Sequence, residues 1–199
     1  SGGVTQNRAG LLGQVADLTL GAVACEFNDL AGVEAALAKG DVAAILTEPV
    51  MTNCCMVLPE AGFLQGLRDL TRKYGALLVI DETHTLSTGL GGYTGVHGLQ
   101  PDMFVVGKCV AGGMPTAVWG MTPAVADRFN AYDAARPAGH SGMGTTLSGN
   151  PMQFACLVAN LGKVMTAERK VMPELARSGS SRSPCWRAAA WPWFRDRRR

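Results

Sequence analysis

Short aliphatic runs alternate with amphipathic stretches along the middle of the chain. Four such runs are bounded by glycine, proline or charged residues, which is typical of strands buried in a sheet. They cover residues 42–46, 77–80, 103–106 and 116–121. A helix opened by Pro59 is predicted between the first two runs, because apolar residues up to Tyr74 recur at helical spacing and Gly75 follows them. This order predicts an α/β fold with a mostly parallel sheet flanked by helices.

Capping residues predict three more helices, and glycines predict a loop. Asn28 or Asp29 can cap a helix over residues 30–37, and Thr122 precedes a helix that reaches about residue 130. Pro151 begins a third helix, which could run through residue 165. The five glycines between residues 85 and 100 predict a mobile loop over the sheet edge.

Two of the predicted strands end in chemically useful side chains. Asp81 and Glu82 follow the run at 77–80, and Lys108 follows the run at 103–106 after one glycine. The carboxyl ends of parallel strands meet at one edge of a sheet, where ligands of α/β proteins bind. A carboxylate and an amine delivered there are candidates for one site.

Pyridoxal phosphate (PLP) chemistry needs such a pair. A lysine amine forms a Schiff base with the cofactor aldehyde, and a carboxylate keeps the pyridine nitrogen protonated. The rival mechanism, a phosphate-binding loop of the Walker A type, requires a glycine and a Ser or Thr where Asp102 and Cys109 stand. The sequence therefore argues against that alternative.

Several segments resemble one family in both order and spacing. The matching segments are 43–50, 74–82, 101–102, 107–108 with 112–115, and 144–151. Over roughly residues 20–165 the chain resembles the class III (subgroup II) PLP-dependent aminotransferases of fold type I. Asn53 after the Glu-Pro-Val run, with the Thr-Leu-Ser-Gly-Asn-Pro run at 146–151, makes it look most like the glutamate-1-semialdehyde aminomutase-like branch.

The resemblance implies a role for each candidate residue. Lys108 would carry PLP as a Schiff base and transfer the amino group, and Asp81 would pair with the pyridine nitrogen. His84 stands where relatives often carry glutamine or methionine, close to the ring, so it could contact the phenolic oxygen or be an ordinary loop histidine. Thr146 would bind the cofactor phosphate across a dimer interface, with Thr145 as the alternative if the register slips by one.

Three further residues are candidates for positions near the site. By resemblance Glu48 and Asn53 lie close to the cofactor, although both could equally be structural. An asparagine at position 53 argues against the ω-amino-acid enzymes, which use a glutamate there to pair with an arginine. Glu82 is expected to support the site rather than touch the ligand.

Composition narrows the class of protein. The chain has 199 residues, and no apolar run approaches the ~18 residues that a membrane span needs. Six cysteines include no CxxC pair and no metal-ligand spacing, so reduced thiols and no metal site are expected. No signal peptide is visible, which favours a cytoplasmic protein without a membrane partner.

The positive charge is confined to the end of the chain. Residues 177–199 hold seven arginines, one aspartate and three of the four tryptophans, without helical or strand periodicity. Residues 1–176 have a net charge of −4. We therefore expect a partial PLP-binding large domain over 1–176 and a disordered or frameshifted tail over 177–199. Since nucleic-acid binding would rest on that tail alone, no nucleic-acid partner is expected.

Family members extend further at both ends, so the resemblance implies a fragment. The intact protein is expected to be a homodimeric transaminase or aminomutase that exchanges an amino group between a small-molecule donor and a keto or aldehyde acceptor. The alternative is a catalytically inactive, truncated piece of such an enzyme.

Overall fold

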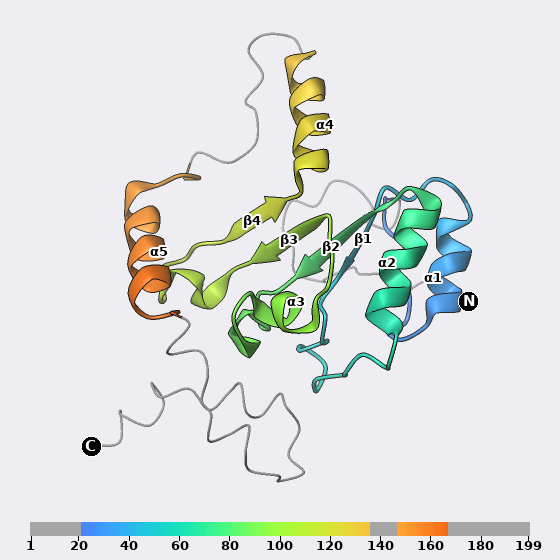
Figure 1. The fold of residues 1–199 in the computed structure, drawn as a ribbon, viewed down its shortest axis with the longest axis horizontal. Coiled ribbons are helices and arrows are strands. Elements are labelled where there is room, and N and C mark those ends of the chain that lie inside the picture. The colour runs from blue at the N-terminus through green and yellow to red at the C-terminus, as the bar shows by residue number, and fades with distance from the viewer. Residues whose placement is uncertain (1–20, 136–146, 167–199) are drawn as a thin grey trace, which may run out of the picture.

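Four short strands form one sheet in the computed structural model, which describes residues 21–135 and 147–166. They are β1 (Ala44–Thr47), β2 (Leu77–Asp81), β3 (Met103–Val106) and β4 (Val118–Met121), in the order β1-β2-β3-β4. The first three run parallel and β4 runs antiparallel to β3, as Figure 1 shows. Each strand overlaps a predicted aliphatic run, and β3 has the predicted bounds. The mostly parallel α/β sheet is confirmed.

Two helices cover one face of the sheet at the β1 edge (Figure 1). They are α1 (Leu30–Leu37) and α2 (Phe63–Tyr74). Side chains alternate between faces along a strand, so Leu78 and Ile80 of β2 both point to this side, where they are 2% and 1% exposed. They pack with Leu67 of α2 and Leu37 of α1 in the main hydrophobic core. This burial fixes the register of β2, and with it the position of Asp81 at the strand end.

The predicted caps explain where these two helices begin and end. Asp29 caps α1, since its Oδ1 accepts a hydrogen bond from the Gly32 amide at 2.9 Å. The start of α2 was predicted too early: Pro59 lies outside it, and Gly62 in the left-handed conformation (φ 85°) turns the chain just before Phe63. The predicted end is confirmed, because Gly75 closes α2 with φ 71°.

Two longer helices follow the sheet. They are α4 (Pro123–Ala134), which begins after Thr122 as predicted and continues beyond residue 130, and α5 (Pro151–Lys163). Figure 1 shows α4 leading away from the end of β4 and α5 lying beside the turn after β3. The Asn150 side chain accepts from the Met152 amide at 2.9 Å and so caps α5.

The prediction of a mobile loop over residues 85–100 was wrong. A 3₁₀ turn, η2 (Leu86–Thr88), and a short helix, α3 (Gly92–His97), occupy this segment. The Glu82 carboxylate, 2% exposed, accepts hydrogen bonds from the amides of Tyr93 at 3.1 Å and Thr94 at 2.6 Å. A carboxylate at a helix start pairs amides that the helix itself leaves unpaired. A long-range contact therefore stabilises a helix that the local sequence does not predict.

Asp102 joins three elements at the amino end of β3. Its Oδ2 accepts from Arg68 of α2 at 2.5 Å and from the Leu78 amide of β2 at 2.8 Å. Its backbone oxygen accepts from the Thr122 amide, beside β4, at 2.9 Å. Burial works to raise the pKa of Asp102, but the hydrogen bonds from Arg68 and the Leu78 amide, with the charges of Arg68 and Arg72, hold the pKa below its usual value.

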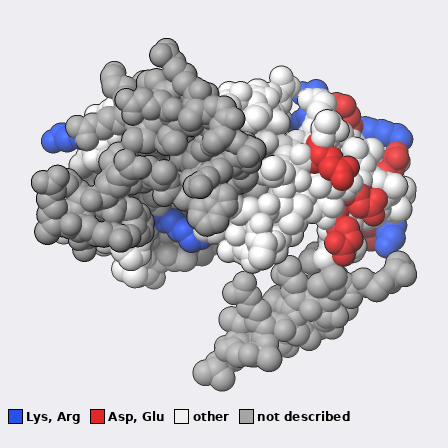
Figure 2. Space-filling view, turned by 90° about the horizontal axis from the view of Figure 1, so that it is seen from below, with Lys and Arg blue, Asp and Glu red and all other residues white. Residues whose placement is uncertain are grey.

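The other face of the sheet lacks an equivalent layer among the described residues. Leu46 of β1 and Trp119 of β4 lie on the face opposite Leu78, and they are 68% and 45% exposed. Figure 2 shows acidic and basic side chains side by side at the end of the molecule formed by α1 and α2. The ion pair there between Lys73 and Glu34, 2.6 Å apart, is exposed and contributes little to stability.

Some expectations concern residues that lie outside the described ranges. The predicted tail, 177–199, is among them, so the domain boundary after residue 176 stays a prediction. Within the described ranges, no helix combines the length and apolarity that crossing a bilayer requires.

Candidate active site

Three predicted site segments meet at the carboxyl edge of the sheet. Glu48 follows β1, Asp81 is the last residue of β2, and Lys108 comes two residues after β3. Thr47 pairs with Ile80, and Asp81 pairs with Val105, so the three parallel strands end level with one another. The structure thus brings these segments to one edge, as the strand pattern predicts.

Lys108 occupies an unusual backbone position. It is the first residue of the 3₁₀ turn η3 (Lys108–Ala111), its φ is 49°, and its side chain is exposed. A residue with a Cβ is strained in the left-handed region, and such strain gathers at functional sites because the surroundings must enforce it. The amine is therefore carried by a constrained turn and not by a flexible loop.

Asn160 of α5 enforces this turn. Its side chain, 6% exposed, donates hydrogen bonds to the carbonyl oxygens of Cys109 at 2.8 Å and Val110 at 2.9 Å. Val110 and Ala111 are buried, with Leu157 of α5 packed against them. No sequence motif predicts a role for Asn160 in the site. Its only sequence signal is an amide residue within the apolar pattern of residues 151–165.

Asp81 is fixed by its own backbone. Its Oδ1 accepts from the Thr83 amide at 2.8 Å, a turn that aspartate commonly makes at a strand end. Its other oxygen, Oδ2, has no hydrogen-bond partner among the described residues. The half-buried carboxylate is oriented and retains one oxygen for a ligand.

Glu82 supports the structure and does not contact the place where a ligand would bind. Besides the two α3 amides, it accepts from the Thr85 hydroxyl at 2.5 Å. Gly92 leaves room for it, since a Cβ there would lie 2.9 Å from Glu82 Oε2. Glu82 is therefore a buried support for α3 beneath the edge.

Glu48, Asn53 and His84 form one cluster, joined by Thr52. The Thr52 hydroxyl donates to Glu48 Oε2 and contacts His84 Nδ1. The Thr52 amide also donates to Oε2, at 3.1 Å, and Asn53 Nδ2 lies 3.3 Å from Glu48 Oε1. Thr52 was missed by the sequence analysis, because a threonine in a loop carries no distinguishing pattern.

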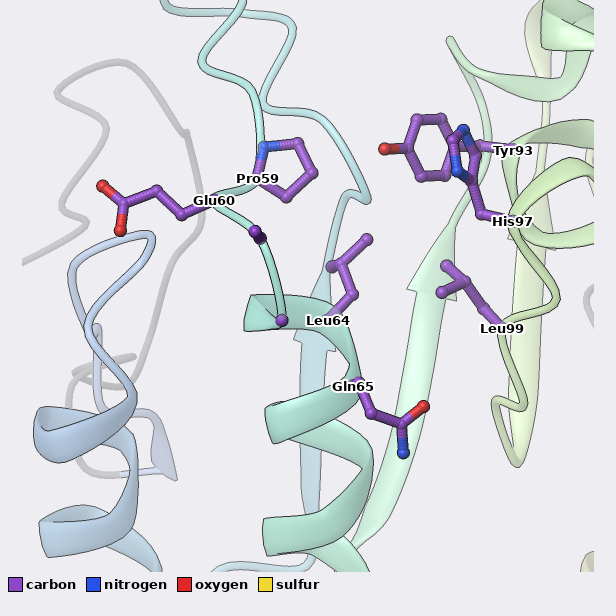
Figure 3. A pocket seen from close by; sticks show the side chains of 9 residues that line it. Pro59, Glu60, Leu64, Gln65, Tyr93, His97 and Leu99 are labelled. Atoms are coloured by element: carbon purple, nitrogen blue, oxygen red, sulfur yellow. The ribbon is translucent and has the colours of Figure 1, made fainter.

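Thr145 and Thr146 lie outside the described residues, so their predicted contact with a phosphate stays a prediction. A separate open pocket of about 250 Å³ lies between the start of α2 and α3. Figure 3 shows the stacked rings of Tyr93 and His97 on one side of it and Leu64 and Pro59 on the other. None of the predicted site residues lines it.

Comparisons with known proteins agree on one family. A family model described as aminotransferase class-III matches residues 12–180. A glutamate-1-semialdehyde 2,1-aminomutase of Acidobacterium capsulatum is 36% identical over 176 residues, which are 87% of this chain and 39% of that protein.

Solved structures resemble the described fold. A glutamate-1-semialdehyde-aminomutase from Pseudomonas aeruginosa PAO1 is 54% identical with a TM-score of 0.68, over 72% of this chain and 33% of that chain. A structure of such an enzyme from the same organism in complex with PMP is 53% identical, with the same TM-score and the same shares covered. The chain thus spans between a third and two fifths of the length of these relatives. The matched length and the fold together show that the chain belongs to the class-III aminotransferase family, with the fold of PLP fold type I.

Proposed function

We propose that this chain carries the PLP-binding core of an aminotransferase of the glutamate-1-semialdehyde aminomutase type. The observation that carries the proposal is the arrangement of two neighbouring parallel strands, which deliver the Asp81 carboxylate and the Lys108 amine to one edge of the sheet. Family membership and the names of the relatives support the same reaction class.

The donor set at this edge fits PLP. The exposed Lys108 amine is accessible to an aldehyde, and Asp81 has one oxygen free of hydrogen bonds within the described part of the chain. When bound, PLP supplies an electron sink for the charge that develops on the carbon next to the amino group. The phosphate would be held by Thr146, or by Thr145, as the family resemblance implies.

Each residue of the site would have a separate role in the reaction. Lys108 Nζ would hold the cofactor covalently, and its free amine would be the base that accepts and returns the substrate proton. The Asp81 carboxylate would pair with the pyridine nitrogen and favour its protonated form, so that the ring can accept electrons. Asn53 and His84, joined through Glu48 and Thr52, would supply polar contacts beside the ring.

The substrates of the whole protein belong to this proposal. The relatives' names support a small aldehyde-bearing amino acid that exchanges its amino group within one molecule. Transfer between a separate amino donor and a keto or aldehyde acceptor uses the same residues. Screening amine donors against such acceptors with the PLP-loaded protein would separate the two reactions.

We also propose that the intact enzyme is a homodimer, as the family resemblance implies, and that it is cytoplasmic, as the sequence prediction has it. Apolar side chains of α5 support an interface, because Phe154 and Val158 are 56% and 70% exposed and share one helix face. Light scattering on the purified full-length enzyme tests the homodimer, and a monomer at the highest concentrations would contradict it.

Borohydride reduction after incubation with PLP, followed by peptide mass mapping, tests the cofactor site. We expect a pyridoxyl adduct at Lys108 and its loss in Lys108→Ala. Lys39→Ala is the matched control, since Lys39 is an exposed lysine that precedes Lys108 by 69 residues. Equal labelling of Lys39 and Lys108 would contradict the proposal. An adduct at Lys108 without turnover of any amine would favour the alternative of an inactive piece.

A further inference from the structure

The cluster of Glu48, Thr52 and His84 constrains where protons can lie. A threonine hydroxyl has one proton and can accept through its lone pairs, whereas an ionised carboxylate only accepts. The Thr52 hydroxyl proton is directed at Glu48 Oε2. The contact between Thr52 Oγ1 and His84 Nδ1 therefore needs its proton from the histidine.

The reverse arrangement is disfavoured by the other contacts of Glu48. It would require a proton on Oε2, yet that oxygen already accepts from the Thr52 amide at 3.1 Å. The second oxygen, Oε1, receives the Asn53 amide at 3.3 Å. Every described partner of this carboxylate is thus placed as a donor to it, and Glu48 fits the role of an acceptor alone.

The carboxylate acts on His84 through the hydroxyl and not directly. His84 Nδ1 lies 3.8 Å from Glu48 Oε2, which is too long for a hydrogen bond. The His84 and Glu48 side chains are 28% and 26% exposed, so this cluster is partly shielded from water. Among the described residues, His84 Nε2 has no hydrogen-bond partner.

We propose that Thr52 is a positioning residue that fixes neutral His84 in the tautomer with the proton on Nδ1. His84 then presents the Nε2 lone pair as a hydrogen-bond acceptor at the carboxyl edge of the sheet, suited to a ligand hydroxyl or ammonium group. That the ligand is PLP with its amino substrate rests on the proposed function. The tautomer rests on the geometry of Glu48, Thr52 and His84 alone.

Nitrogen-15 spectroscopy of the histidine rings tests the proposal directly. Spectra are recorded at a pH high enough that the ring signals no longer change with pH, because the two nitrogens of a neutral imidazole give distinct signals. The chain has three histidines, and His84→Asn identifies the signals of His84. We expect the Nδ1–H form to dominate at His84, although free histidine prefers Nε2–H. A dominant Nε2–H form in the unmodified protein would overturn the proposal.

Three variants separate the hydroxyl from other effects. Thr52→Val keeps the shape but removes the hydroxyl, so His84 should revert to mostly Nε2–H. Thr52→Ser keeps the hydroxyl and should retain the Nδ1–H form. Thr47→Val is the matched control, because the Thr47 hydroxyl donates to the Glu48 backbone oxygen and does not contact His84. An unchanged tautomer in Thr52→Val would count against the assigned role.

The same samples distinguish failure of this inference from failure of the proposed function. An adduct at Lys108 with His84 in the Nε2–H form would leave the PLP site standing and refute the role of Thr52. The Nδ1–H form without any adduct would support the role of Thr52 and contradict the cofactor proposal.

Discussion

A single strained residue carries the amine at the centre of the proposed chemistry. Lys108, the first residue of η3, adopts φ 49° directly after Gly107, which is extended. The direction of its side chain follows from this backbone conformation, because the next residues are hydrogen-bonded to Asn160. The strain is thus offset by contacts outside the turn.

Substitutions of Lys108 should separate the effect of backbone strain on stability from the effect of losing the amine. Lys108→Gly and Lys108→Val both remove the amine, but only glycine adopts positive φ without cost. We expect Lys108→Gly to unfold with a free energy about 1–2 kcal/mol higher than Lys108→Val, measured by urea denaturation. The same pair of changes at Lys163, which lies in the α-helix α5, should not show this preference for glycine. Equal stability of the two variants at position 108 would contradict the claim that the backbone there is strained.

Individual site residues differ in how well the sequence reveals them. Asp81 and Lys108 follow aliphatic runs directly, so their place at the sheet edge could be predicted. Thr52 could not, because its importance depends on His84, 32 residues later in the chain. Thr52 follows Glu48 by four residues, but the sequence does not show that the loop after β1 brings their side chains into contact.

Among the elements, α3 depends most on one distant side chain. Glu82 → Leu would leave the amides of Tyr93 and Thr94 and the Thr85 hydroxyl without their partner. We expect a loss of about 3 kcal/mol in unfolding free energy, because buried polar groups without partners are costly. Glu82→Gln keeps an acceptor oxygen and should lose less.

Amide hydrogen exchange locates the effect of that change. In Glu82→Leu the amides of Tyr93 and Thr94 should exchange faster, while those in the middle of α2 should change only with global stability. Stability and amide exchange in Glu82→Leu equal to those of the unmodified protein would show that Glu82 does not support α3.

The elements could be predicted where local pattern and burial agree. Leu77–Asp81 and Met103–Val106 are aliphatic runs between polar ends, and both are strands in the structure. Gly92–His97 has glycines that suit a loop, yet it is a helix in which the buried Glu82 carboxylate accepts from two amides. Such a contact joins residues ten or more positions apart, which no local periodicity encodes.

At the scale of the whole molecule, Asp102 couples stability to pH. Its folded-state pKa lies below the usual value, so the folded state favours the ionised form. This contribution is fully present above the unfolded pKa, about 4, and is lost as the pH falls through the folded pKa. The Asp102 carboxylate contacts Arg68 of α2 and the Leu78 amide of β2, and therefore its protonation should weaken the packing of α2 and β3 against β2.

Asp102→Asn provides the corresponding measurement. At neutral pH the variant should unfold at a lower urea concentration than the unmodified protein. This difference between the two urea midpoints should become smaller as the pH is lowered from about 5 to below 4. Asp127→Asn, a change at an exposed position of α4, should have nearly the same urea midpoint as the unmodified protein at each pH. A difference in urea midpoint for Asp102→Asn that stays constant with pH would contradict the assigned coupling.

The contact between Asn160 and the turn of Lys108 also sets an order in time. Asn160 follows Val110 by 50 residues, and a ribosome adds about 5–20 residues per second. During synthesis the lysine turn therefore precedes its partner by about 3–10 seconds. In a growing chain Lys108 leaves the ribosome before the side chain that holds its turn, so the turn of Lys108 acquires its final hydrogen bonds only when α5 has emerged and folded against η3.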